Sequence, residues 1–304
     1  MIRRRDLLKA GLAGGVLLGG RGMVRGGQAG AKGVLAVCSG KQAAAMLERV
    51  LEPLGSLESF VTPGSLVVVK PNASFANPPE WGNNTSPELV AALCRQVLDA
   101  GARRVLVVDY PLRGGAEALE QNGIAAACRG VAGVQLEVLG ERRQFVKVPV
   151  PAGEVLKEVE IARAVLDADL VINLPVAKAH DAVAASIGLK NLMGVIWDRT
   201  AFHTMLEINQ AIADLARVVR PQLTIVDMTR VMVTNGPQGP GEVEQPNLLV
   251  ACRDPVAADA YCLGRVRFNR RRLRPHQVRY LRLAHQAGLG QIDPRRLEIK
   301  QQTA

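Results

Sequence analysis

Short apolar runs rich in β-branched residues alternate along this chain with stretches of helical periodicity. The run Leu66-Val67-Val68-Val69 has no polar side chain, which is typical of a strand buried on both faces of a sheet. Five further runs are predicted as strands: Val34–Cys38, Val105–Val108, Leu170–Asn173, Leu223–Val226 and Leu248–Ala251. Because parallel strands need long, usually helical, connections, the alternation predicts an α/β fold with a mainly parallel sheet and helices on both faces.

Helical patterns separate these strands. Helices are predicted over Gln42–Leu54, up to Ala100, about Ala116–Cys128, Met205–Val219, from Asp254-Pro255 onward and roughly over Pro275–Ala287. Thr85-Ser86-Pro87-Glu88 is predicted to be a capping box with Thr85 at the N-cap. Val134–Leu139 and Phe145–Val150 are predicted as a small β-hairpin insertion, and Ile161–Leu166 as a helix. Since no internal repeat or low-complexity linker is visible, residues 31–304 are expected to form a single domain.

The first thirty residues have the composition of an export signal. Arg3-Arg4-Arg5 precede Asp6–Lys9 and an apolar, glycine-rich run, Ala10–Gly20. This order resembles a twin-arginine signal and predicts a periplasmic protein that is exported in folded form. The run is about half of the roughly 20 residues that span a bilayer, so a permanent transmembrane helix is not expected. Gly27–Ala29 is the nearest small-residue cleavage site; an uncleaved signal would tether the protein to the membrane. The alternative is a basic start on a cytoplasmic enzyme.

The formal net charge is +10, and much of the excess comes from arginines near the C-terminus. This basic region contains Arg265, Arg267, Arg270, Arg271, Arg272, Arg274, Arg279 and Arg282. Such a cluster can meet nucleic acid, anionic lipid or an acidic partner. Only Phe268 and Tyr280 stand among the arginines and no nucleic-acid-binding motif is present, so nucleic acid is not an expected partner. A solvated helical face and association with a membrane surface, through this region or the signal segment, remain as interpretations.

The five cysteines match no metal-cluster pattern. Cys38, Cys94, Cys128, Cys252 and Cys262 form no Cys-x-x-Cys and have neither zinc nor iron–sulfur spacing. No iron–sulfur cluster is therefore predicted in this chain. In an oxidising compartment a disulfide can form, and Cys252–Cys262 is the pair to test first.

Polar residues stand where the predicted strands end. Ligands of open α/β sheets bind outside the carboxyl ends of the strands, so these residues are expected to line one cleft. They are Lys70, Asn72, Asp109, Asn173, Lys178, His180 and Asp227. A further lysine, Lys190, is embedded with Asn191 in an apolar segment, where a charge needs a partner or a ligand.

Three lysines stand in the most motif-like segments of the chain, although arginine is its more frequent cation. Lys70, Lys178 and Lys190 are predicted to hold one small anionic ligand, since an ammonium is a compact charge whose pKa can shift on burial. Lys178 and Lys190 are also candidates for catalysis. His180 and His203 are the predicted proton-transfer groups, because neutral histidine titrates near working pH.

Carboxylates support a competing interpretation. Asp109, Asp227 and Asp259, together with the two histidines, could ligate a divalent metal, although their long spacings form no local metal motif. The glycine-rich segment 235–241 lacks the Gly-Lys-Ser/Thr ending of a phosphate-binding P-loop. Its backbone amides could still bind an anion.

Several of these segments occur together in one known family. They are Lys70-Pro71-Asn72, Thr85-Ser86-Pro87-Glu88-Leu89, Asn173-Leu174-Pro175 with Lys178 and His180, Gly188-x-Lys190-Asn191-x-x-Gly194, His203, Asp227, Gly236-Pro237 with Gly239, and Asp254-Pro255-x-x-x-Asp259. The order resembles the DUF362 family, a domain of unknown function, over about residues 34 to 290. The resemblance implies ligand-binding positions at Lys70, Asn72, Thr85, Asn173, Asn191, Gly236 and Gly239, and it implies no reaction.

This chain departs from the family pattern in two respects. Many members resemble iron–sulfur proteins because they carry a ferredoxin-like module, whose cysteines are missing here, so any cluster would belong to a partner. Ser86 also stands where histidine is often found, which removes one metal ligand. Two functions remain open. One is a periplasmic enzyme that acts on a small anionic or carbonyl-bearing molecule by Lys/His acid–base chemistry. The other is a non-catalytic ligand- or metal-binding accessory protein for an exported redox partner.

Overall fold

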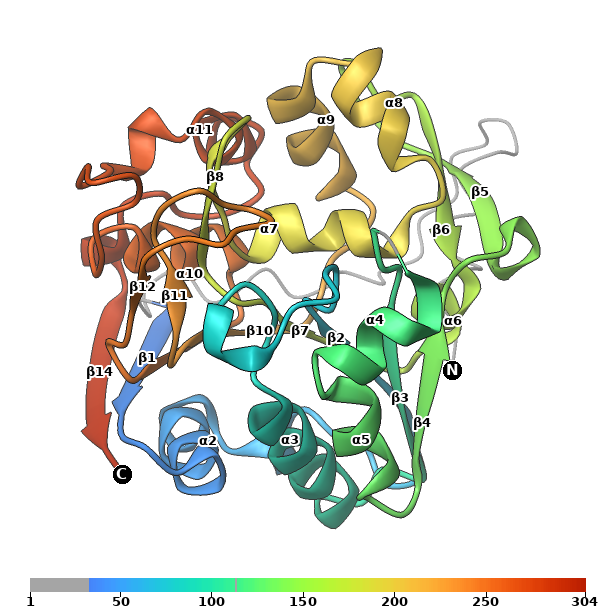
Figure 1. The fold of residues 1–304 in the computed structure, drawn as a ribbon, viewed down its shortest axis with the longest axis vertical. Coiled ribbons are helices and arrows are strands. Elements are labelled where there is room, and N and C mark those ends of the chain that lie inside the picture. Colours follow the sequence, from blue (N-terminus) through green and yellow to red (C-terminus); the bar gives the residue numbers. More distant parts are fainter. Residues whose placement is uncertain (1–32, 113) are drawn as a thin grey trace, which may run out of the picture.

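An eight-stranded sheet forms the centre of the fold in the computed structural model, which describes residues 33–112 and 114–304 (Figure 1). Its strands, in spatial order, are β14 (Glu298–Thr303), β1 (Val34–Ser39), β13 (Leu248–Cys252), β10 (Leu223–Met228), β7 (Leu170–Leu174), β2 (Leu66–Pro71), β3 (Arg104–Asp109) and β4 (Val134–Val138). Within this sheet only β13 pairs antiparallel with its neighbours; all other pairs are parallel. The predicted α/β fold with a mainly parallel sheet is confirmed.

Helices cover both faces of the sheet (Figure 1). One face carries α2 (Ala43–Leu51), α3 (Pro87–Asp99), α4 (Gly115–Gln121) and α5 (Ile124–Arg129). The other carries α7 (Gly188–Asn191), α8 (Arg199–Thr204), α9 (Ile208–Leu215), α10 (Pro255–Cys262) and α11 (Arg279–Gln286). Successive side chains of a strand point to opposite faces, so Val67 and Val69 join one hydrophobic cluster and Val68 the other. This arrangement explains why the strands have continuous apolar sequences.

Shorter elements complete the fold. Two-stranded sheets pair β5 (Phe145–Pro149) with β6 (Glu158–Ala162), β8 (Lys178–His180) with β9 (Ala184–Ser186), and β11 (Val231–Met232) with β12 (Val243–Glu244). In the described part of the chain, the remaining helix is α6 (Arg163–Asp167). Short 3-10 turns are η2 (Glu52–Leu54), η3 (Leu57–Ser59), η4 (Pro79–Trp81), η5 (Arg142–Gln144), η6 (Leu192–Val195), η7 (Pro275–Gln277) and η8 (Pro294–Arg296).

The hairpin predicted from Val134–Leu139 and Phe145–Val150 is wrong, because these two strands do not pair with each other. Val134–Val138 is the edge strand β4 of the main sheet, parallel to β3, because α4 and α5 form the crossover between them. Phe145–Pro149 pairs instead with β6, which contains Ile161 and Ala162. The helix expected from Ile161 therefore starts only at Arg163. The helix expected from Met205 is also shorter, since Met205 follows α8 and α9 begins at Ile208.

The predicted capping box is displaced by one residue. The N-cap of α3 is Ser86, with Pro87 at the first helical position. The Thr85 hydroxyl accepts a hydrogen bond from the Asn72 amide at 2.8 Å and donates one to the Leu174 carbonyl at 2.7 Å. Thr85 therefore connects the ends of β2 and β7 and does not cap the helix.

All five cysteines are buried and free, so Cys252 and Cys262 are not bridged. The Cys252 thiol donates to the Val34 carbonyl on the neighbouring strand, at 3.3 Å. Burial raises the pKa of Cys252 to about 12, so the thiol is inert at neutral pH.

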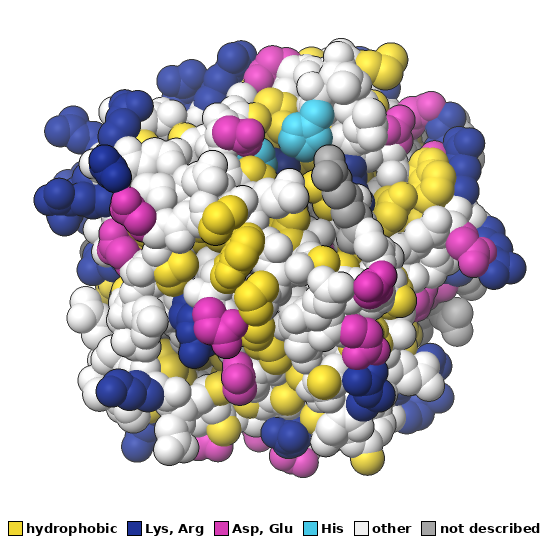
Figure 2. All heavy atoms as spheres, viewed as in Figure 1, with side chains coloured by type: hydrophobic (Ala, Val, Ile, Leu, Met, Phe, Trp, Pro, Cys, Tyr) yellow, Lys and Arg dark blue, Asp and Glu magenta, His cyan; other side chains and the backbone are white. Residues whose placement is uncertain are grey.

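The predicted export signal, residues 1–30, lies outside the described residues. Among the helices that are described, none combines the length and apolar character that crossing a membrane requires. All eight arginines of the basic region are exposed, and Arg270 and Arg279 pair with Glu242 and Glu207. Figure 2 shows basic side chains gathered at the upper left edge, where α11 lies in Figure 1.

Candidate functional site

A cavity of about 610 Å³ opens beyond the carboxyl ends of the central strands. Segments from distant parts of the chain surround it: the loop after β2, the β8–β9 hairpin, α7, α8 and the glycine-rich loop 235–239. Figure 2 shows histidine at the surface of this face. Eight of the predicted site residues line the cavity, namely Asn72, Lys178, His180, Lys190, Asn191, His203, Gly236 and Gly239. Residues that the sequence did not single out also line it, among them Phe75, Asp181, Met193 and Arg199.

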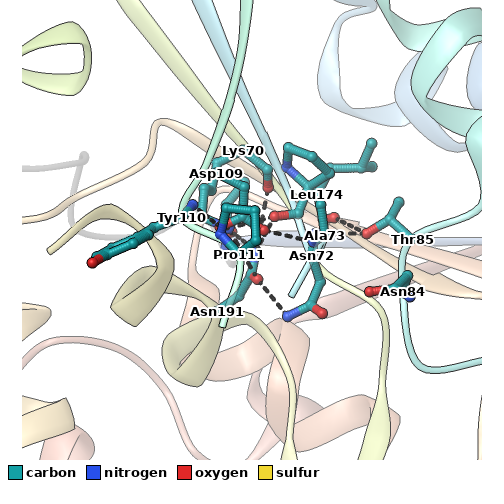
Figure 3. A network of polar contacts seen from close by, with 12 residues as sticks. Lys70, Asn72, Ala73, Asn84, Thr85, Asp109, Tyr110, Pro111, Leu174 and Asn191 are labelled. Atoms are coloured by element: carbon teal, nitrogen blue, oxygen red, sulfur yellow. Dashed lines mark hydrogen bonds and ion pairs between the residues drawn. The ribbon is translucent and has the colours of Figure 1, made fainter. Parts of the chain in front are cut away.

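A buried ion pair lies beneath the cavity (Figure 3). Lys70 Nζ lies 2.8 Å from Asp109 Oδ1, and neither side chain is more than 2 % exposed. Asp109 also accepts hydrogen bonds from the amides of Ala73 at 2.6 Å and Tyr110 at 2.8 Å. Burial lowers the pKa of Lys70, and Asp109 opposes that shift. Lys70 is therefore engaged within the protein, which differs from the predicted role of ligand holder.

Asparagine amides connect this pair to the cavity, and Figure 3 labels two of them, Asn72 and Asn191. Lys70 Nζ donates to Asn191 Oδ1 at 3.3 Å, and Asn72 Nδ2 donates to the same oxygen at 2.9 Å. Asn191 Nδ2 in turn donates to Asn173 Oδ1 at 2.8 Å. Lys178 Nζ donates to Asn72 Oδ1 at 2.7 Å. The amides fix each other's orientation, so they hold Lys178 at the cavity wall.

The other two predicted metal ligands, Asp227 and Asp259, accept hydrogen bonds from backbone amides. Asp227 accepts hydrogen bonds from the amides of Ser86 at 2.8 Å and Thr229 at 2.9 Å. Asp259 accepts from Gly188 at 2.7 Å and Leu189 at 3.0 Å, at the start of α7. Burial raises the pKa of both carboxyls, that of Asp259 to about 7.

The three predicted metal ligands are not assembled. Asp109, Asp227 and Asp259 each serve separate backbone amides, and only Asp109 adjoins a cation of the network. No group of three or more His, Cys, Asp or Glu suited to a metal ion occurs in residues 33–112 and 114–304.

Glycine at position 194 permits the close approach of η6 to the buried pair. A Cβ at this position would lie 2.3 Å from Asp109 Oδ1 and 2.7 Å from Lys70 Nζ. Both atoms are buried and belong to the ion pair, so moving either of them would disturb it. The spacing Gly188-x-Lys190-Asn191-x-x-Gly194 thus reflects how tightly this segment packs against the strand ends.

Gly194→Ala is expected to reduce the free energy of unfolding by about 1–3 kcal/mol, because overpacking forces the ion pair or the backbone to shift. Urea unfolding followed by circular dichroism measures the change. Gly140→Ala is the matched control, since a Cβ there meets nothing within 4 Å. Equal stability of the two variants would contradict the proposed close packing.

Among the cations that line the cavity, Lys190 has the weakest hydrogen-bond acceptor. Its side chain is buried, with 9 % of the residue exposed. Its hydrogen-bond partner among the described residues is the Met193 thioether, at 3.2 Å. Burial lowers the pKa of Lys190 to about 8; Arg199 contributes in the same direction and Asp181 opposes the shift.

Arg199 is a cation of the cavity lining that the sequence did not single out. It donates to the carbonyls of Tyr110 at 2.6 Å and Pro111 at 3.0 Å, and its guanidinium lies 4.0 Å from the centre of the Tyr110 ring. The available signal was its spacing, four residues before His203, which places both side chains on one face of a helix.

Lys178 is almost completely buried, at 2 % exposure. Besides Asn72 Oδ1 it donates to the Asn83 carbonyl at 2.5 Å, and its Nζ lies 4.8 Å from the centre of the Phe75 ring. Burial lowers the pKa of Lys178 well below that of an exposed lysine; Asp109 opposes this shift, and Lys190 and Lys70 add to it.

His180 and His203 lie with parallel rings, 6.5 Å between centroids. Burial, followed by the charges of Lys190 and Lys178, lowers the pKa of His180 to about 3. Burial and Lys190 also lower the pKa of His203. His180 is therefore a neutral imidazole whose Nδ1 accepts from the Ala182 amide at 3.1 Å. Its 2.9 Å contact with Asp181 is consequently not an ion pair.

The glycine-rich loop closes one side of the cavity. Asn77 and Asn83 donate to the Gln238 carbonyl at 2.8 and 2.9 Å. A Cβ at Gly236 would lie 2.1 Å from the Ala179 carbonyl, so the loop lies directly on β8. The loop is therefore held at a fixed distance from Lys178 and His180 on that strand.

The DUF362 family, described as a domain of unknown function, matches residues 67–264. The chain belongs to the DUF362 family. This match confirms the family resemblance, and it includes every residue that lines the cavity. The thylakoid-associated protein sll1697 of Synechocystis is 30% identical over 223 residues, which is 71% of this chain and 67% of that protein.

Two solved structures are similar to this DUF362 chain. A crystal structure of a protein from Thermotoga maritima has a TM-score of 0.43 and 13% identity, covering 80% of this chain and 59% of that one. The lactate racemase apoprotein from Thermoanaerobacterium thermosaccharolyticum has a TM-score of 0.48 and 15% identity, covering 78% of this chain and 58% of that one. The chain thus spans less than two thirds of the length of either structure.

Proposed function

We propose that this DUF362 protein binds a small anionic molecule in the strand-end cavity, with Lys190 and Arg199 holding its negative charge. The observation that carries the proposal is the Lys190 ammonium, which is buried beside a second cation and donates to a thioether, a weak acceptor. A buried charge without an acidic partner is costly, and a bound anion would offset that cost.

The lining of the cavity favours an anion over a cation. It contains two cations, Lys190 and Arg199, against a single carboxylate, Asp181, whose side chain is 79% exposed. The volume, about 610 Å³, lies within the range typical of small-molecule sites. A compact carboxylate satisfies both cations, since guanidinium and ammonium groups form short charge-assisted hydrogen bonds to carboxylate oxygens.

The histidines acquire a role when the anion is bound. In the ligand-free protein burial, followed by the charge of Lys190, holds the pKa of His180 and His203 low. A bound negative charge offsets that cation and raises the pKa of both imidazoles toward working pH. Proton transfer by the histidines is therefore proposed for the ligand-bound state.

Pyruvate binding, measured by isothermal titration calorimetry, tests the anion site and its pH dependence. Lys190 is surrounded by Arg199, Asp181, Lys178 and the two histidines. Within this group of side chains, Lys190 is the cation that we expect to lose its charge just above neutral pH. Because its pKa is about 8, half of the Lys190 side chains are charged at pH 8 and about a tenth at pH 9, so affinity is expected to fall about fivefold between these two pH values. Acetone, which has the carbonyl without the charge, is the matched control ligand. Equal binding of pyruvate and acetone, or no pyruvate binding, would refute the anion site.

A further inference from the structure

Two oxygen acceptors and one aromatic ring surround the Lys178 amine nitrogen. An amine has two N–H donors and one lone pair, whereas an ammonium has three donors and no lone pair. The structure provides two oxygen acceptors, Asn72 Oδ1 at 2.7 Å and the Asn83 carbonyl at 2.5 Å. The third neighbour is the face of the Phe75 ring. The two oxygens satisfy both donors of a neutral amine, and the ring face can also accept the third N–H of an ammonium, so these contacts suit either form. Lys178 lines the cavity, where the neutral form would have a lone pair available.

The other two lysines of the site have different surroundings. Lys70 is paired with Asp109 and does not line the cavity. Lys190 lines the cavity beside Arg199 and is suited to bind charge. Lys178 is almost completely buried and lies within electrostatic range of Lys190 and Lys70. Burial first, and then these two charges, lower its pKa and favour the neutral amine. A neutral lysine amine beside other cations is the arrangement that activates lysine as a nucleophile.

We infer that Lys178 forms an imine with the carbonyl group of a 2-oxo acid whose carboxylate is held by Lys190 and Arg199. This inference rests on the proposed function, because the anion site orients the carbonyl toward Lys178. The Nζ lone pair attacks the carbonyl carbon and gives a carbinolamine. Loss of water then forms the C=N bond, and the two amine hydrogens leave with the former carbonyl oxygen. The step consumes no oxidant or reductant.

Borohydride trapping tests the imine. The full chain is incubated with pyruvate, treated with sodium borohydride and analysed by intact-protein mass spectrometry and peptide mapping. We expect one covalent adduct per chain, with the mass of pyruvate less one oxygen, on the peptide that contains Lys178. The variant Lys178→Met should not be trapped, but it loses two buried donors and its folding can fail. Peptide mapping of the wild-type adduct identifies the reacting lysine without that variant. Lys41→Met, at an exposed lysine, is the matched control and should trap pyruvate as the wild type does.

The outcomes separate the imine from the anion site. Trapping at Lys178 supports the inference, and trapping at Lys190 or only at exposed lysines overturns it. If pyruvate raises Tm but leaves no adduct, the anion site stands and the imine is refuted. In Lys190→Met, pyruvate trapping should fall at least about tenfold, the loss expected for one charged hydrogen bond, while trapping of uncharged propanal at Lys178 persists. Loss of both reactions would contradict the separate roles of the two lysines.

Discussion

Lys70→Met is expected to reduce the free energy of unfolding by about 3–5 kcal/mol, because it leaves the Asp109 carboxylate buried without its cation. Asp109 is fully buried, and the two amides that remain as its donors carry no net charge. For a chain of this size, the loss corresponds to a fall in Tm of roughly 5–8 °C. Urea unfolding and differential scanning calorimetry measure the two quantities.

A double-mutant cycle separates the ion pair from simple loss of packing. Lys70→Met, Asp109→Asn and the double variant are compared at one pH. The double variant is expected to lose about 1–3 kcal/mol less than the sum of the single variants, since neither partner is then left as an unpaired charge. Lys147→Met is the matched control, because Lys147 pairs with Glu158 at the surface, where ion pairs contribute little. Additive losses in the cycle would show that the pair contributes no coupling.

The strand ends were predictable because their signal is local. Uninterrupted β-branched runs identify parallel strands, and parallel topology alone places Lys70, Asp109 and Asn173 at one edge of the sheet. The prediction that this edge holds the site is consistent with the cavity found there. Parallel topology does not indicate which of the polar residues faces the cavity and which lies below it. That difference depends on the packing of α7 and η6 against the sheet.

The carboxylates show why residue type alone did not predict the site. An aspartate at the end of a strand can ligate a metal, cap a turn or pair with a lysine, and these roles share one sequence pattern. Asp227 and Asp259 instead accept backbone hydrogen bonds from Ser86 and Gly188, far away in the sequence. Arg199 was missed for the same reason, because its contact with the Tyr110 carbonyl spans 89 residues.

Lys190→Met is expected to weaken pyruvate binding by about tenfold to a hundredfold, the effect of losing one charged hydrogen bond. The ligand-free variant should be at least as stable as the wild type. Methionine keeps most of the side-chain volume, and the buried ammonium that it replaces has only a thioether as its partner. Lys190 and Lys70 thus have opposite expected effects: loss of Lys70 unfolds the protein more easily, and loss of Lys190 impairs binding.

The pH dependence of stability gives a second test of Lys190. Its pKa is about 8 in the folded protein, below the ordinary lysine value of 10.5. Between these values the unfolded chain binds more protons, so the contribution of Lys190 to wild-type stability rises with pH. Any stability advantage of Lys190→Met should therefore be largest below pH 8 and shrink toward pH 10. Calorimetric Tm values over that range, with Lys41→Met as the matched control, measure the trend. If Lys190→Met is strongly destabilised without ligand at pH 7, the lysine stabilises the fold and the proposed anion site loses its supporting observation.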